Sequence, residues 1–287
     1  MIFDRIAILD WSAAKGPRLG KDSIWLAVAE AGGEACTALN LPTRLQAEAA
    51  LIKLCRQTRA KGQRLLLGAD FAFGAPQGFI PALTGQANAL SWWGWLADRI
   101  TETPKNESNY RQIAALMNSR YGGDGPFWGN GEKQPTPGLP RLMPPLPAGL
   151  RPHRQTDQAA RGPGSAPKPI WQLAGAGAVG AQVLTGLPVL HRVRQHFAGH
   201  VAVWPFEPAT RPIVLVEVYP SLLAEAVRAH VARTGSVVDE AQVRLLACAL
   251  ARLGPGQMQA LFTAPDTAEE GWILGAGQEA LLRSALG

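Results

Sequence analysis

Residues 6–10 (IAILD) and residues 64–70 (RLLLGAD) decide the fold of this chain. Each stretch is a short apolar run that ends in an aspartate, a pattern typical of a strand buried inside a sheet. Residues 23–29 (SIWLAVA) and roughly residues 34–39 predict two more strands after the first, separated by a turn at Gly32 and Gly33. The beginning of the chain is therefore expected to form an antiparallel meander of three strands.

A helix is expected between the third and fourth strands. Thr43 can cap its start, with Gln46 three residues later, and Gly62 can end it. Three strands, a helix and a fourth strand is the element order of a ribonuclease H-like half-sheet, in which strand one pairs with strand four in parallel. Residues 213–219 (IVLVEVY) predict a fifth strand, and helices are expected over 221–233 and 239–253. We expect an α/β fold with a ribonuclease H-like mixed five-stranded sheet flanked by helices.

A long segment rich in Gly, Pro and Trp lies between the fourth and fifth strands. Proline is too frequent in its middle for a regular core, although a helix is expected around residues 90–100. We therefore predict a ribonuclease H-like core formed by residues 1–73 and 212–287, with an insertion subdomain formed by residues 74–211. Residues 169–190 lack charge, but polar residues and glycines dilute their hydrophobicity, so we expect a buried segment and no membrane helix.

The composition is that of a globular protein with a mild positive charge. Lys and Arg number 28 and Asp and Glu 22, which gives a net charge of +6, and charged residues make up 17% of the chain. This balance does not indicate a protein that coats nucleic acid. The three cysteines are widely spaced and form no CxxC pair, which argues against a disulfide framework and against a cysteine zinc site. No signal-peptide pattern is present at the N-terminus, and a cytoplasmic location is expected.

Four acidic residues stand where predicted strands or helices begin or end: Asp10, Asp70, Glu217 and Asp239. If strands one and four are parallel neighbours, Asp10 and Asp70 lie side by side, and their mutual repulsion calls for a cation. All four are therefore candidate catalytic residues and ligands of Mg²⁺ or Mn²⁺, ions that can activate water and stabilise the leaving oxygen in phosphodiester hydrolysis. The alternatives are structural: Asp70 could bind turn amides, and Asp239 could form a capping box with Gln242.

Four further residues are candidate contacts of a phosphate group. Arg154 and Lys168 lie in the positively charged insertion and could neutralise a bound phosphate. Ser12 and Lys15 follow Asp10 in DWSAAK. This stretch is distantly similar to the Asp-x-Gly-Thr sequence with which sugar kinases and actin-like ATPases hold metal and phosphate. An ATP-dependent phosphotransferase is therefore one alternative function, although those proteins need two such domains around one nucleotide.

Several stretches together resemble a known family: ILDWSAAKGP with GKDSIWLA, GADFAFGAP, VWPFE, VEVYPSLL and the late helix with its acidic start. The chain resembles the predicted ribonuclease H-like nuclease family catalogued as an uncharacterised domain (number 429), and the similarity covers most of the sequence, including RQTD and WQLAGAGAVG. The resemblance implies a ribonuclease H fold with Asp10 and Asp70 in metal-site positions. It also matches Glu217 to the family's Glu-x-x-Pro pattern and, more loosely, Asp239 to the acid of the last helix.

These observations predict a divalent-metal-dependent phosphoesterase, with a nuclease as the first candidate and a phosphate-containing substrate such as nucleic acid. The wider superfamily often has a second acid further into the last helix, where this chain has Gln242 and Arg244. A non-catalytic binding module is therefore the other alternative, with nucleic acid, a protein or a small ligand bound by the Trp- and Arg-rich insertion. Aromatic residues interleaved with arginines are typical of single-strand binding, but tryptophans can equally anchor an irregular subdomain.

Overall fold

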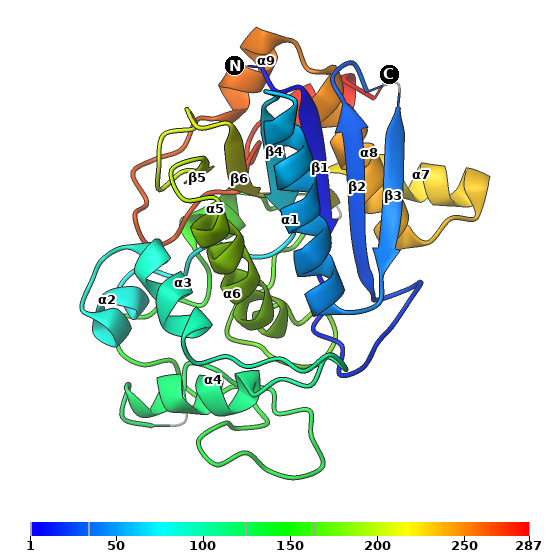
Figure 1. Ribbon diagram of the computed structural model, residues 1–287. Coiled ribbons are helices and arrows are strands. Elements are labelled where there is room, and N and C mark those ends of the chain that lie inside the picture. Colours follow the sequence, from blue (N-terminus) through cyan, green and yellow to red (C-terminus); the bar gives the residue numbers. More distant parts are fainter. Residues whose placement is uncertain (1, 34, 124, 163–164, 287) are drawn as a thin grey trace.

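The sheet at the centre of the molecule has six strands in the order β3-β2-β1-β4-β6-β5 (Figure 1). The computed structural model describes residues 2–33, 35–123, 125–162 and 165–286. The first three strands are β1 (Arg5–Asp10), β2 (Ile24–Glu30) and β3 (Cys36–Leu41), and they form the predicted antiparallel meander. The third strand begins two residues later than expected, and position 34, where we placed its start, lies outside the described residues.

The other three strands extend the sheet from β1 in parallel. β4 (Leu65–Ala69) pairs with β1, β6 (Ile213–Glu217) pairs with β4, and β5 (Val201–Val203) pairs with β6. The expected count of five strands is therefore corrected to six. The additional strand, β5, comes from within residues 74–211 and has three residues, which are too few to show an alternating pattern in the sequence. The division of the chain at residues 73 and 211 stays a prediction.

Helices cover both faces of the sheet, with α1 in front of it and α8 behind it in Figure 1. The helices are α1 (Arg44–Ala60), α2 (Phe79–Thr84), α3 (Ala89–Ala97), α4 (Tyr110–Ser119), α5 (Gln155–Ala159), α6 (Gly180–His196), α7 (Ala224–Thr234), α8 (Val238–Arg252), α9 (Pro255–Leu261) and α10 (Glu279–Ser284), with a 3₁₀ turn, η1 (Pro220–Leu223). The predicted cap of α1 is confirmed, because the Thr43 hydroxyl accepts a hydrogen bond from the Gln46 amide at 3.2 Å.

The alternation of side chains along the central strands divides the core into two layers. Odd-numbered residues such as Leu9 and Leu67 pack with α1 and α6, whereas even-numbered residues such as Ile8 pack with α8. Asp10 and Asp70 have even numbers, so both lie on the α8 side of the sheet. Position 217 is odd, so Glu217 lies on the opposite side.

The aromatic residues of the insertion are core residues. Trp92, Trp93 and Phe127 are fully buried. The Phe79 ring lies at the centre of this cluster, stacked on Tyr121 at 5.4 Å and edge-on to Trp92 at 5.5 Å. These rings anchor a region that has little regular structure, as one of the two interpretations of the sequence expected, whereas Trp95 and Trp128 are only partly buried.

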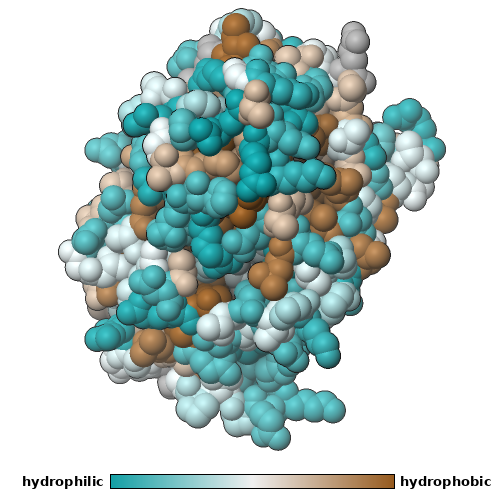
Figure 2. All heavy atoms as spheres, viewed as in Figure 1, coloured by the Kyte–Doolittle hydropathy of each residue, from teal (hydrophilic) through white to brown (hydrophobic). Residues whose placement is uncertain are grey.

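The uncharged segment over residues 169–190 continues into α6, which is buried from Val183 to Leu190. Gly186 permits the close approach of this helix to the sheet, because a Cβ atom there would lie 2.5 Å from Cζ of Phe71. Among the described residues, no helix combines the length and the hydrophobicity needed to cross a membrane. The face in Figure 2 mixes hydrophilic and hydrophobic groups, and the hydrophobic ones lie scattered over it.

Candidate carboxylate site at the carboxyl end of the sheet

Asp10 and Asp70 are neighbours at one edge of the sheet. Asp10 is the last residue of β1, and Asp70 directly follows β4. The register pairs Leu9 with Ala69, and the Asp70 amide donates a hydrogen bond to the Leu9 carbonyl at 2.9 Å, so the ladder continues to the aspartates. Both residues are partly exposed, and both lie on the α8 side. The folded chain therefore brings together these two residues, which are 60 positions apart in the sequence.

No cationic side chain among the described residues compensates the charge of the two carboxylates. No Lys or Arg of the described residues forms an ion pair with either of them, and none of those residues donates a hydrogen bond to the Asp70 carboxylate. The turn-amide explanation of Asp70 therefore finds no support. Burial and then the charge of Asp70 raise the pKa of Asp10 well above its usual value, while the Trp11 amide opposes this effect. Burial, with the charges of Glu217 and Asp239, raises the pKa of Asp70 to about 7.

Asp239 is the third carboxylate on this side of the sheet. It lies in the first turn of α8, and its Oδ2 accepts a hydrogen bond from the Asp22 amide at 2.6 Å. The helix is capped at Val237 without a side-chain bond, so the capping box with Gln242 considered for Asp239 is absent. The charge of Asp239 raises the pKa of both other aspartates, which places it near both. In the part of the chain that the structure describes, no set of three or more His, Cys, Asp or Glu side chains is arranged so that it could hold a metal ion.

Glu217 and Arg154 form a buried ion pair close to Asp70, since Glu217 pairs with Ala69 and its charge raises the pKa of Asp70. Arg154 donates to both carboxylate oxygens of Glu217, at 2.7 and 2.6 Å, and the Phe73 amide donates to the same group at 2.9 Å. Arg154 also donates to Asp157, at 2.7 and 3.3 Å, and to the Glu270 carbonyl at 3.0 Å.

This network engages all five N–H donors of the arginine and both oxygens of Glu217. Burial raises the pKa of the Glu217 carboxyl, and the Arg154 guanidinium opposes that effect. We therefore revise two expectations: Arg154 has no donor left for a phosphate group, and both oxygens of Glu217 are held by Arg154 and the Phe73 amide.

The other three predicted phosphate contacts form no bond to the aspartate pair, and their contact with a phosphate stays a prediction. The Ser12 hydroxyl donates to the Asp22 carbonyl at 2.8 Å and so shapes the loop between β1 and β2. Lys15 is exposed and pairs with Glu132 at 2.7 Å. Lys168 is exposed, and its charge acts on His153 on the surface of the insertion. None of the three forms a hydrogen bond or an ion pair with either aspartate of the pair.

Residues that no motif indicated hold the loop that follows Asp10. Arg44 is buried and donates to the carbonyl oxygens of Ser12 and Ala14, at 3.2 and 3.0 Å. Gln182 donates to the Trp11 carbonyl at 2.8 Å. The only sequence signal for Arg44 is its place in the first turn of an expected helix, which says nothing of its partners. The insertion thus contributes, through α6, to fixing the backbone next to Asp10.

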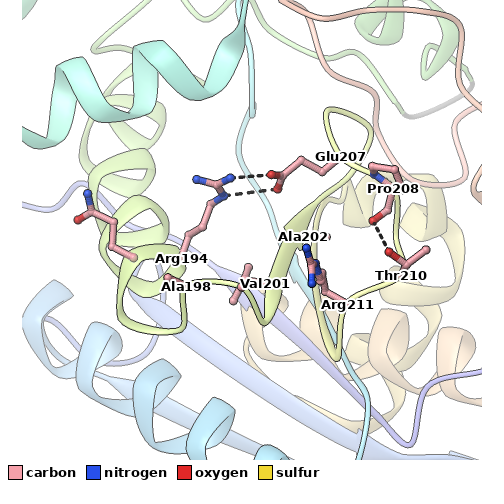
Figure 3. A pocket seen from close by; sticks show the side chains of 10 residues that line it. Arg194, Ala198, Val201, Ala202, Glu207, Pro208, Thr210 and Arg211 are labelled. Atoms are coloured by element: carbon pink, nitrogen blue, oxygen red, sulfur yellow. Dashed lines mark hydrogen bonds and ion pairs between the residues drawn. The ribbon is translucent and has the colours of Figure 1, made fainter.

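A hollow of about 440 Å³ lies at the other end of the sheet, between the end of α6 and the loop at residues 207–211 (Figure 3). Its lining includes Val201, at the start of β5, and the ion pair of Arg194 with Glu207 at 2.6 Å. Val201 pairs with Ile213, the first residue of β6, whereas the aspartates lie where the parallel strands end. This hollow is therefore separate from the carboxylate site.

Comparison with protein-family models, with curated proteins and with solved structures finds no match for this chain.

Proposed function

We propose that this protein is a divalent-metal-dependent phosphoesterase on a ribonuclease H-like fold, with a nuclease as the first candidate. The observation that carries the proposal is the adjacent pair Asp10 and Asp70, two carboxylates without a cationic partner among the described residues. Their raised pKa values express first the free energy needed to ionise buried carboxyls and then the charges of neighbouring acids, Asp70 for Asp10, and Glu217 and Asp239 for Asp70. A cation between them removes that penalty, and carboxylate oxygens are the ligands that Mg²⁺ and Mn²⁺ prefer.

The residues present fit such an ion in part. Asp10 and Asp70 would hold it, because both residues are partly exposed and neither forms an ion pair with a Lys or Arg of the described residues. Asp239 stays a candidate ligand by its nearness to the pair, but its Oδ2 accepts a hydrogen bond from the Asp22 amide, and among the described residues it does not complete a set of three ligands. We no longer propose Glu217 as a metal ligand, because Arg154 and the Phe73 amide form hydrogen bonds to its carboxylate oxygens.

The chain's own residues supply the negative charge that would bind the ion and hold the Asp10 carboxylate in position. A bound divalent ion contributes polarisation of water and of a phosphate oxygen. The loop after Asp10, fixed by Arg44 and Gln182, keeps the backbone beside that carboxylate in one conformation. A fixed carboxylate does not have to reorganise when the substrate binds, which is the main contribution that a rigid scaffold makes to such catalysis.

The two alternative functions draw less support from the described residues. A single-strand binding module needs exposed aromatic rings, and Trp92 and Trp93 are fully buried. A phosphotransferase of the sugar-kinase type would use Lys15 near the phosphates, and that side chain pairs with Glu132.

Calorimetric titration of MnCl₂ into the purified protein tests the metal site. We compare wild type, Asp10→Asn and, as a matched control, Asp266→Asn, which changes an exposed aspartate. Wild type and the control are expected to bind Mn²⁺ alike, and Asp10→Asn to bind at least about tenfold more weakly, as removal of a charged ligand predicts. Equal binding by all three proteins would refute the site.

Hydrolysis is measured on the same three proteins with labelled single-stranded RNA, single-stranded DNA and bis(p-nitrophenyl) phosphate in Mn²⁺. The proposal expects cleavage of at least one substrate that disappears in Asp10→Asn and persists in Asp266→Asn. Metal binding without cleavage of any of the three would overturn the phosphoesterase and favour a binding module.

A further inference from the structure

Cys36 and Cys248 lie together, although 212 positions separate them in the sequence. Cys36 is the first residue of β3, an edge strand, and Cys248 lies on α8, which packs against β3. The Cys36 thiol donates to the Thr37 carbonyl at 3.9 Å, and a Cβ atom on Gly33, just before β3, would lie 2.9 Å from the Cys248 carbonyl oxygen, so the start of β3 lies against the helix at Cys248. Arg244, one helical turn before Cys248, donates to the Cys36 carbonyl at 2.9 Å and so fixes the strand against this part of the helix.

The surroundings of this thiol pair favour a thiolate on Cys248. The neighbouring Cys36 thiol lowers the pKa of Cys248 to about 7, with further contributions from the charges of Arg252 and Arg244. Both cysteines are partly exposed, so small reagents in water can reach them. A thiolate near neutral pH with access to solvent is the condition for reaction with oxidants.

Cys55 offers an internal comparison. It is fully buried in the layer that contains α1. Burial raises the pKa of its thiol to about 12, so this cysteine stays protonated and shielded near neutral pH. The structure thus contains one pair of thiols suited to oxidation and one thiol that is not.

We propose that Cys36 and Cys248 form a redox-active dithiol that a peroxide converts reversibly into a disulfide joining β3 to α8. The Cys248 thiolate attacks one oxygen of hydrogen peroxide, the O–O bond breaks, and the products are the Cys248 sulfenic acid and, after uptake of a proton, water. The sulfur of Cys36 then attacks the sulfenic sulfur, the S–O bond breaks, and the Cys36 proton leaves with the hydroxyl group as a second water. The two thiols are oxidised by two electrons in total, and the peroxide is reduced.

This disulfide would close most of the chain into one covalent loop. Cross-links that close long loops restrict the unfolded chain most, so the oxidised protein is expected to melt at a higher temperature than the reduced protein. The bond would also tether α8, which carries Asp239 at its first turn, to the edge of the sheet. The proposal does not depend on metal binding, and the Cys248→Ser protein is expected to bind Mn²⁺ as wild type does.

The test uses the full-length protein treated with a small excess of hydrogen peroxide and then digested without reduction. Mass spectrometry is expected to show a peptide that links Cys36 to Cys248, free thiols are expected to fall from three to one, and dithiothreitol is expected to restore all three. Cys55→Ser should form the same link, whereas Cys36→Ser and Cys248→Ser should not. At neutral pH, iodoacetamide should label Cys248 before Cys36 and Cys55.

Two results would overturn the proposal. One is the absence of the linked peptide in both wild type and Cys55→Ser after peroxide has consumed thiols. The other is oxidation of Cys248 to sulfinic acid while Cys36 remains a free thiol, because the second cysteine would then not resolve the first product. Circular dichroism of each serine variant, together with Cys36→Ala as a second change at that position, separates the loss of the link from a loss of folding.

Discussion

Replacing Asp70 by Asn is expected to stabilise the metal-free protein at pH 8. The Asp70 carboxyl has a pKa of about 7 in the folded chain and a usual value of 3.8, a difference of about three units. Each unit corresponds to about 1.4 kcal/mol, which sets an upper value of about 4 kcal/mol for the penalty of ionising this group in the fold. Because the side chain is partly exposed and solvent screens its charge, we expect about 2–4 kcal/mol.

The sign follows from the direction of the shift. A carboxyl whose pKa is raised in the folded state binds its proton more tightly there than in the unfolded chain. Its contribution to stability is therefore complete below pH 4 and is lost as the pH rises to about 7. The asparagine side chain has nearly the same shape and cannot ionise, so the variant and wild type should have similar free energies of unfolding at pH 4 and should diverge toward pH 8.

Urea unfolding at pH 4, 6 and 8 in EDTA measures this difference, with Asp266→Asn as the exposed control. The control is expected to follow wild type within about 0.5 kcal/mol at every pH. Addition of Mn²⁺ at pH 8 should then stabilise wild type and leave Asp70→Asn nearly unchanged. A variant that is no more stable than wild type at pH 8 would show that the folded chain does not disfavour the ionised form of Asp70, and the argument for a cation at this carboxylate would fail.

Two substitutions away from the aspartate pair test how the fold supports it, both measured by urea unfolding. Arg154→Met leaves Glu217 buried without its cation and is expected to lower the free energy of unfolding by about 3–5 kcal/mol; a loss below about 1 kcal/mol would contradict the structural role given to this ion pair. Gly186→Ala places a Cβ atom against the Phe71 ring and is expected to destabilise by about 1–3 kcal/mol, while Gly256→Ala, which meets open space, should be neutral or slightly stabilising; equal effects at the two glycines would refute the close helix contact.

The main strands and the first helix were predictable because local patterns encode them. The apolar runs that end at Asp10 and near Asp70 are long enough to identify buried strands, and Thr43 marks the start of α1. The three-residue strand β5 was not predictable, since its pairing with β6 depends on a neighbour that is distant in sequence.

The candidate site also contains one feature that local sequence predicts and one that depends on residues distant in the sequence. The residue pattern was enough to show that Asp10 and Asp70 each follow a buried strand, and a parallel pairing of those strands was enough to expect them side by side. The partner of Glu217, an arginine 63 residues away in the sequence, became visible only in the folded chain. Strand patterns arise from neighbours along the chain, whereas the partner of a buried charge is chosen by whatever the fold brings within hydrogen-bond distance.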